Sequence, residues 1–260
     1  MIELTEQNII ETISKFQSDE HYYSDIKFIS NSMLSHLKKS PKDLARHFEK
    51  GSPETPAMVF GRAFHKAILE PEVFSDEVAI YEGKTKRGKA WDEFVEINNK
   101  RKRDVTKVEF EVIKGMEDAL FFNKDVARLL HGKKEVPMVW QDTLSSVWCK
   151  GKVDIINGNQ ILDVKTTQDA SLEGFRRSAY KYGYNRQAAF YMDGFGVSSF
   201  VFVVIEKKAP YNIGVYECSQ DFIESGREEY TNLLLDYKKY FNFTEESNKE
   251  LANYYHQGVL

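Results

Sequence analysis

The sequence predicts an α+β protein in which a mixed β-sheet core is flanked by helices and wrapped by a helical N-terminal region. Up to Leu130 the apolar residues recur mostly at helical spacing, and from Glu135 the spacing changes to the alternation of strands. Beyond residue 170, helical and strand patterns alternate. With 42% hydrophobic residues, 260 residues are enough for one large domain. We expect its parts to be a mainly helical region, an α/β core and a tail: residues 1–130, 131–241 and 242–260.

Start and stop signals bound the helices of the first half. Five are expected: residues 3–17, residues 31–37, one that starts at residue 41, residues 56–69 and residues 105–130. Ser30 or Asn31 caps the second helix, and Ser40 followed by Pro41 is typical of a helix start. Pro71 ends the fourth helix and Gly132 the fifth.

The second half alternates strands and helices. Strands are expected over residues 136–140, 147–156, 160–165, 200–206 and 212–218, and helices over residues 172–181, 184–193 and 221–240. Asn157-Gly158-Asn159 predicts a tight hairpin turn between the second and third strands.

This hairpin carries the most informative residues. Successive side chains of a strand point to opposite faces, so Asp163 and Lys165 share one face, while Asp154 is on the polar side of the preceding strand. The hairpin can therefore bring the three side chains to one rim. Two carboxylates beside an ammonium suit a hard divalent cation and an activated water. The alternative is an ordinary cross-strand ion pair on a solvated sheet face.

Composition narrows the class of protein without choosing its chemistry. No apolar run approaches the roughly 20 residues that a membrane span needs, and the N-terminus lacks a signal-peptide pattern. Cys149 and Cys218 are far apart and form no C-x-x-C motif, which predicts a reducing compartment. We therefore expect a cytoplasmic protein.

The net charge of −4 argues at first against a nucleic-acid ligand, but the basic residues are clustered. The clusters are Lys84, Lys86, Arg87 and Lys89; Lys100, Arg101, Lys102 and Arg103; and Arg176, Arg177, Lys181 and Arg186. The first cluster lies in a stretch, residues 82–89, that lacks apolar periodicity and predicts a mobile basic loop. A local basic surface is what contact with phosphates requires. Each cluster alternatively forms a merely solvated face.

Four short motifs follow one another in a specific order. They are G-x-x-x-H ending at His65, then Asp154, then D-x-K over residues 163–165, and Q-x-x-x-Y from Gln187 to Tyr191. Together they resemble the PD-(D/E)xK nuclease superfamily, in particular its RecB-like branch. Residues 29–34 and the Leu69-Glu70-Pro71 stretch are most similar to RecE-type, exonuclease VIII-like phage proteins. The resemblance covers residues 30–191 and implies a restriction-endonuclease-like fold. The iron–sulfur cluster of some RecB-like nucleases is excluded, because the chain lacks four thiolates.

The resemblance also implies a metal site. Asp154, Asp163, His65 and the Val164 carbonyl are expected to hold Mg²⁺, for which Mn²⁺ can substitute, and Lys165 is expected to orient the attacking water and help to deprotonate it. A histidine on an apolar helix is alternatively a core or surface residue. Glu70 and Glu135 are further carboxylates near the rim, but neither is expected to be a direct ligand.

Other residues are expected to contact DNA. Gln187 and Tyr191 share a helix face with Tyr184 and, by the resemblance, bridge the catalytic strand to a phosphate. The alternative is that these aromatic residues fill the core. Arg186 faces elsewhere and is expected to meet the DNA backbone. Hydroxyls and backbone N–H groups near Ser32 and Ser35 suit an anion, which we take to be a 5′-terminal phosphate.

The sequence therefore predicts a Mg²⁺-dependent exodeoxyribonuclease that digests duplex DNA from 5′ to 3′ and leaves 3′ overhangs for phage-type recombination. The alternatives are a RecB-like endonuclease, an exonuclease of opposite polarity, and a catalytically silent DNA-binding scaffold. Expected partners are duplex ends, a single-strand annealing recombinase and further copies of the chain in a trimeric or tetrameric ring. The alternative to the ring is a monomer. The expected setting is a bacterial cell, with a phage or prophage gene.

Overall fold

The computed structural model of the protein describes residues 4–98 and 103–257. Its centre is a five-stranded sheet in the order β3-β4-β5-β6-β7. The strands are β3 (Lys133–Gln141), β4 (Trp148–Asn157), β5 (Gln160–Thr167), β6 (Ser199–Glu206) and β7 (Ile213–Glu217). β5 and β6 are parallel and the other neighbours antiparallel, so the predicted mixed sheet is confirmed. The crossover that a parallel pair requires is made by α10 (Leu172–Tyr182) and α11 (Tyr184–Phe195).

The predicted hairpin turn is also confirmed. Asn157 pairs with Gln160, so the two-residue loop is Gly158-Asn159. Gly158 has a left-handed φ of 58°, which a residue without Cβ adopts at no steric cost. The turn fixes the register that places Ile155 opposite Leu162.

Both faces of the sheet are covered, and β6 shows how. Phe200, Phe202 and Val204 pack on one side against α10, α11 and α12 (Gln220–Tyr240). Val201 and Val203 pack on the other side, against α5 (Pro56–Leu69), α8 (Lys107–Phe122) and α9 (Lys124–Leu129). The core is therefore two apolar layers divided by the sheet.

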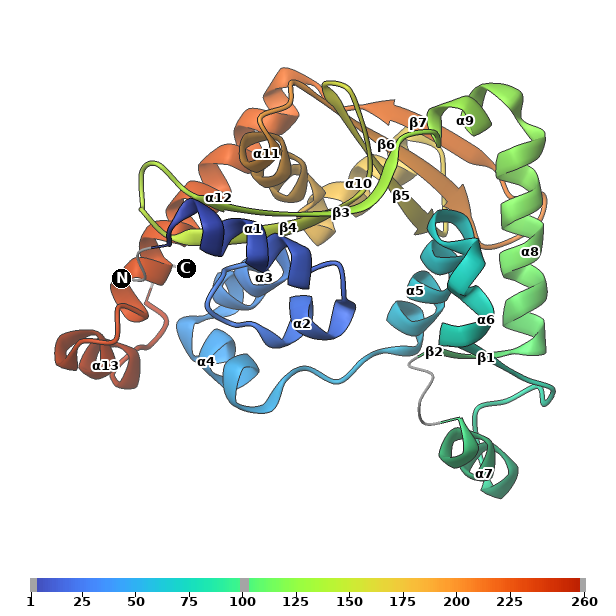
Figure 1. Ribbon diagram of the computed structural model, residues 1–260, viewed down its shortest axis with the longest axis horizontal. Helices are drawn as coiled ribbons and strands as arrows, with labels where there is room; N and C mark the ends of the chain where they lie inside the picture. The colour runs from blue at the N-terminus through green and yellow to red at the C-terminus, as the bar shows by residue number, and fades with distance from the viewer. Residues whose placement is uncertain (1–3, 99–102, 258–260) are drawn as a thin grey trace.

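Four N-terminal helices gather beneath β3 and β4 (Figure 1). They are α1 (Glu6–Lys15), α2 (Asp19–Ser24), α3 (Asn31–Lys39) and α4 (Pro41–Lys50). Ser30 caps α3 and Ser40 caps α4, as expected. Where β4 no longer pairs with β5, Ile29 bridges Cys149 of β4, which sets the start of α3.

Lys150 of β4 fastens α2 to the sheet. This lysine is 1% exposed, and its ammonium donates to the backbone carbonyls of Tyr22 and Asp25. Burial lowers the pKa of Lys150 to about 8. Phe16 packs with Tyr22 and with Val139 of β3 in the same small apolar cluster.

Several elements differ from the expectation. The single helix expected over residues 105–130 is instead β2 (Arg103–Thr106), α8 and α9, because Thr106 and Asn123 each cap a new helix. β2 pairs in parallel with β1 (Val78–Tyr81), and neither strand was expected. Further short elements are η1 (Pro71–Val73), α6 (Phe74–Glu77), α7 (Lys89–Ile97) and α13 (Glu245–Ala252), the last within the expected tail.

The expected basic loop lies between β1 and α7, but it ends at Gly88 because Lys89 begins α7, and its mobility stays a prediction. Lys100, Arg101 and Lys102 lie outside the described residues. Figure 1 shows α7 standing apart from the sheet. None of the helices in the described part of the chain combines the length and the apolar character that a membrane-spanning helix requires.

Candidate metal centre

Asp154 sits where the two strands of the hairpin separate. The ladder between β4 and β5 runs from the turn to the pair Ile155 and Leu162. Just beyond this pair, Oδ2 of Asp154 accepts a hydrogen bond from the backbone N–H of Val164, 2.8 Å away. The carboxylate thus takes the place of a strand partner. Its Oδ1 lies 3.6 Å from Nδ1 of His65.

Glu135 of β3 lies opposite Asp154, because the antiparallel register places it between the pairs Lys134–Ile155 and Val136–Val153. Its φ of 50° is left-handed, a conformation that costs a residue with a Cβ about 1 kcal/mol. Burial and the charge of Asp154 raise the pKa of Glu135 to about 8. Like charges that face each other across a ladder repel, and a bound cation removes that repulsion.

His65 reaches the same point from α5. Its Nε2 lies 2.6 Å from the carbonyl oxygen of Val164, so this nitrogen carries the proton and donates it. Nδ1 then presents its lone pair on the side of Asp154. Metal-binding histidines are commonly oriented in this way, with the second ring nitrogen donating to a carbonyl. In this structure the Val164 carbonyl therefore accepts a hydrogen bond from His65, and the expected role of this carbonyl as a metal ligand stays a prediction.

These residues fit a divalent cation. The ligand atoms of His65, Glu135 and Asp154 all lie within 4.8 Å of one another. Oxygen ligands on opposite sides of one Mg²⁺ or Ca²⁺ ion are about 4 to 5 Å apart, given metal–oxygen distances of about 2.1 to 2.5 Å. Two carboxylates and an imidazole suit Mg²⁺ or Mn²⁺ better than a metal that seeks thiolates. The sequence expectation included two of the three residues and gave Glu135 no direct role.

Asp163 and Lys165 lie beside this group, on the face of β5 that points to α11. Asp163 is 2% exposed, and its Oδ2 lies 2.5 Å from the ammonium of Lys165. Its other oxygen accepts a hydrogen bond of 2.8 Å from the side-chain amide of Gln187. Burial raises the pKa of Asp163 to about 6, against the attraction of Lys165. Gln187 therefore contacts β5, whereas its expected contact with a DNA phosphate and the expected role of Asp163 as a direct metal ligand stay predictions.

Lys165 is held as an ammonium ion. Burial on its own would lower the pKa of Lys165, but the nearby carboxylates of Asp163 and Asp154 outweigh it and raise the pKa above its ordinary value. The ammonium also lies 5.2 Å from the ring centre of Tyr184, within range of a cation–π contact.

Tyr191 lies one turn after Gln187 and belongs mainly to the core. It is 9% exposed and packs among the residues of the α11 layer. Gly151 of β4 makes room for it, since a Cβ at that position would come within 2.9 Å of the Tyr191 ring. Burial raises the pKa of its hydroxyl.

The expectation that Arg186 meets DNA is wrong. The residue is 1% exposed, and its guanidinium donates to Asn31 Oδ1, Ser35 Oγ and Glu229 Oε1 at 2.9, 2.5 and 2.6 Å. Arg186 thus joins α11 to α3 and α12. Ser35 accepts a hydrogen bond from Arg186 and is half-buried, and Ser32 is exposed; the expected DNA role of both serines stays a prediction.

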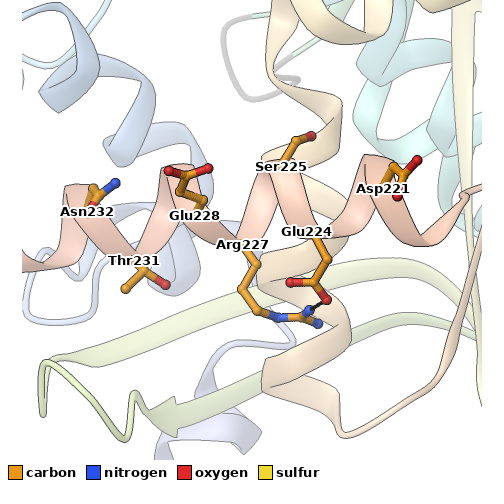
Figure 2. Close-up of a pocket in the computed structure, with 7 residues that line it drawn as sticks. All are labelled: Asp221, Glu224, Ser225, Arg227, Glu228, Thr231 and Asn232. Carbon is orange, nitrogen blue, oxygen red and sulfur yellow. Dashed lines mark hydrogen bonds and ion pairs between the residues drawn. The ribbon is translucent and has the colours of Figure 1, made fainter.

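Two other acidic features are not part of the group formed by His65, Glu135 and Asp154. Glu70, which ends α5, is bound by the ammonium of Lys66. A surface hollow on α12 is lined by acidic residues, among them Asp221, Glu224 and Glu228 (Figure 2). Because Arg227 in this hollow is ion-paired with Glu224 and Asp193, the hollow offers no free cation to a phosphate among the residues that line it.

Comparisons with known proteins bear on the fold. No curated protein matches the sequence. A crystal structure described as a "Putative exonuclease" from Eubacterium rectale has a similar fold, with a TM-score of 0.59 and 13% identity over 100% of this chain and 97% of the other. A crystal structure of SSO0001 aligns with a TM-score of 0.40 and 12% identity, over 86% of this chain and 85% of that one. At such identities the first likeness shows a shared fold, and the second carries no weight.

The family described as "PDDEXK-like domain of unknown function (DUF3799)" matches residues 30–257. The match spans all the residues of the metal centre, together with Asp163 and Lys165, and it confirms the resemblance to the PD-(D/E)xK superfamily and the predicted fold class. The chain belongs to this family of PDDEXK-like domains.

Proposed function

We propose that the protein is a Mg²⁺-dependent nuclease that hydrolyses phosphodiester bonds of DNA. The observation that carries the proposal is the convergence of His65, Glu135 and Asp154 beside the ammonium of Lys165. When bound, a divalent cation supplies a Lewis acid that activates water and offsets the charge of the phosphate.

The chain's own residues prepare the reaction around that ion. The nearby carboxylates of Asp163 and Asp154 raise the pKa of Lys165 above its ordinary value in the metal-free protein. Its expected part, to orient the attacking water and help to deprotonate it, is kept in the proposal. Lys165 holds Asp163 and stabilises the negative charge that develops on the phosphate. Gln187 fixes the other oxygen of Asp163, so that the carboxylate keeps one orientation.

The proposal is tested by following the hydrolysis of a fluorescent duplex in Mg²⁺, in Mn²⁺ and in excess chelator. Asp163→Asn and Lys165→Met are expected to lower kcat at least about 100-fold, the usual effect of removing a group that stabilises transition-state charge. Glu228→Gln, a similar change in the hollow on α12, is the control and is expected to keep wild-type activity. Unchanged turnover in Asp163→Asn, or full activity in chelator, would reject the proposal.

We further propose that digestion starts at duplex ends and runs from 5′ to 3′, leaving 3′ overhangs for recombination with a single-strand annealing partner. Support comes from the RecE-type motifs and from the likeness to the "Putative exonuclease" fold. Duplexes labelled at the 5′ or the 3′ end are expected to release 5′-label first, and faster with a 5′-phosphate if Ser32 helps to hold it. Rapid nicking of closed circles would favour an endonuclease instead.

The proposed assembly is a ring of three or four copies around DNA. A chain with a net charge of −4 has little means of retaining a duplex by charge alone, and a closed ring retains it by topology. Light scattering on a sizing column is expected to give a trimeric or tetrameric mass. A monomeric mass with and without DNA would reject the ring and leave the proposed chemistry intact.

A further inference from the structure

Neither the backbone conformation nor the packing requires a glycine at position 61 of α5. It lies inside a helix, where glycine is less favourable than alanine, and it is not among the residues with a left-handed φ. A Cβ built at Gly61 meets no atom within 4 Å. The other described glycines differ: each has a left-handed φ or would bring a Cβ against a neighbour. The space over Gly61 is therefore open, and the helix is less stable than it would be with alanine at this position.

The open space adjoins the metal centre. Met58, Gly61, Arg62 and His65 recur at i, i+3, i+4 and i+7 and so share one face of α5, while Phe60 and its buried neighbours form the opposite face. Helical side chains lean toward the N-terminus of their helix, so the imidazole of His65 leans back toward the turn that contains Gly61. Met58 is 50% exposed, which places the far end of this face at the surface.

Arg62 places a partly exposed guanidinium on the same face of α5. Its side chain is 27% exposed and is ion-paired with Glu54, in the segment that precedes α5. A phosphodiester that lies over Gly61 can reach the exposed part of this guanidinium and compete with Glu54 for it, one turn from His65.

We propose that the backbone of the substrate DNA strand lies over Gly61, between Arg62 and His65, on its way to the metal centre. Gly61 is then a specificity-determining residue that admits the strand because it has no side chain. This inference rests on the proposed nuclease function and names the place where its substrate lies.

The experiment compares Gly61→Ala and Gly61→Met with wild type and with Asn232→Ala, a control that replaces an exposed residue of α12 by a better helix former. Four quantities are measured: Tm in chelator, the affinity for Mn²⁺, the Kd for duplex DNA in Ca²⁺, and kcat and KM in Mg²⁺. Gly61→Ala is expected to raise Tm by about 2 to 4 °C, because alanine favours the helix. Asn232→Ala is expected to raise Tm as well, with unchanged kinetics.

Activity is expected to fall as stability rises. Gly61→Ala should lower kcat/KM by about tenfold and Gly61→Met by about 100-fold, the usual effect of displacing a substrate by roughly 1 Å. Most of the loss should appear in KM and in the Kd in Ca²⁺, with Mn²⁺ affinity unchanged. Wild-type kcat/KM in Gly61→Met, or a lower Tm in Gly61→Ala, would overturn the inference.

Failure of the proposed function gives a different result. If wild type binds DNA without cleaving it, the nuclease proposal fails. The place of the DNA strand is then tested by the Kd for duplex DNA alone, and equal Kd values for wild type and Gly61→Met reject a strand over Gly61. If wild type neither binds nor cleaves DNA, both proposals are overturned.

Discussion

Replacing Glu135 by glutamine is expected to stabilise the metal-free protein while it disables the metal site. The amide has nearly the volume of the carboxylic acid, so the change removes one titrating group from β3 and leaves no cavity. The expected gain follows from the pKa of Glu135, which burial and Asp154 raise from 4.5 to about 8.

The sign of the effect comes from the protons bound in each state. Between about pH 4.5 and pH 8 the folded protein keeps a proton on Glu135 that the unfolded chain releases. Stability is therefore lost as the pH rises through this window. At about 1.4 kcal/mol per pKa unit, the free energy of unfolding of the metal-free wild type should fall by about 3 kcal/mol between pH 5 and pH 8 through this group.

Urea denaturation in chelator at pH 5, 6, 7 and 8 measures this slope. Between pH 5 and pH 8 the free energy of unfolding of Glu135→Gln should fall by about 3 kcal/mol less than that of wild type, so the variant is the more stable protein at pH 8. Glu111→Gln, the same change at an exposed position of α8, is the control and should keep the wild-type slope.

The same samples with Mn²⁺ complete the test. A cation at 100 times its Kd stabilises a folded protein by about 2.7 kcal/mol, and this gain should appear in wild type and be much smaller in Glu135→Gln. Parallel pH profiles of wild type and Glu135→Gln, or equal stabilisation by Mn²⁺, would refute the role of Glu135.

Three further outcomes are expected. Arg186→Met should destabilise the protein by about 1 to 3 kcal/mol in urea denaturation, because three hydrogen bonds between helices are lost while Glu229 keeps its ion pair with Lys38. It should leave the salt dependence of DNA binding unchanged, and a smaller salt slope would show that Arg186 does contact DNA. Gln187→Leu should lower kcat at least about tenfold with an unchanged circular dichroism spectrum, because Asp163 loses its orienting amide; full activity would contradict that role. Gly158→Ala should cost about 1 kcal/mol of stability at the left-handed turn and spare catalysis, and a change in kcat would show that the hairpin had shifted register.

Local signals predicted most of the fold. Ser40 with Pro41 marks a helix start through its own hydrogen bonds, and the hairpin turn is encoded by a glycine at a left-handed position. β1 and β2 were missed because each has four residues and pairs with a strand far along the chain, so neither leaves a local pattern. The break between α8 and α9 depends on capping by Asn123 inside a continuous helical periodicity.

The site residues that belong to short sequence motifs could be predicted from the sequence. His65 and Asp154 lie in recognisable patterns and do meet in space. The part of Glu135 depends on the register of β3 against β4 and on its left-handed φ, which no local pattern shows.

The burial of Arg186 likewise depends on distant residues. α12 approaches α11 so closely that a Cβ at Gly226 would lie 2.1 Å from the carbonyl oxygen of Asn185. That close approach brings Glu229 of α12 to the guanidinium and closes it off from solvent. Such contacts between helices far apart in the sequence are invisible until the helices are packed.

The contacts between α2 and β4 matter for the stability of a truncated protein. The family match begins at residue 30, so a fragment cut to its limits keeps every residue of the metal centre. It loses the carbonyls of Tyr22 and Asp25 that receive Lys150, and the carboxylate of Asp19 that receives Lys152, 2.8 Å away. Two ammonium groups on the strand that carries Asp154 would then lack these partners. We therefore expect a fragment limited to residues 30–257 to be less stable than the whole chain.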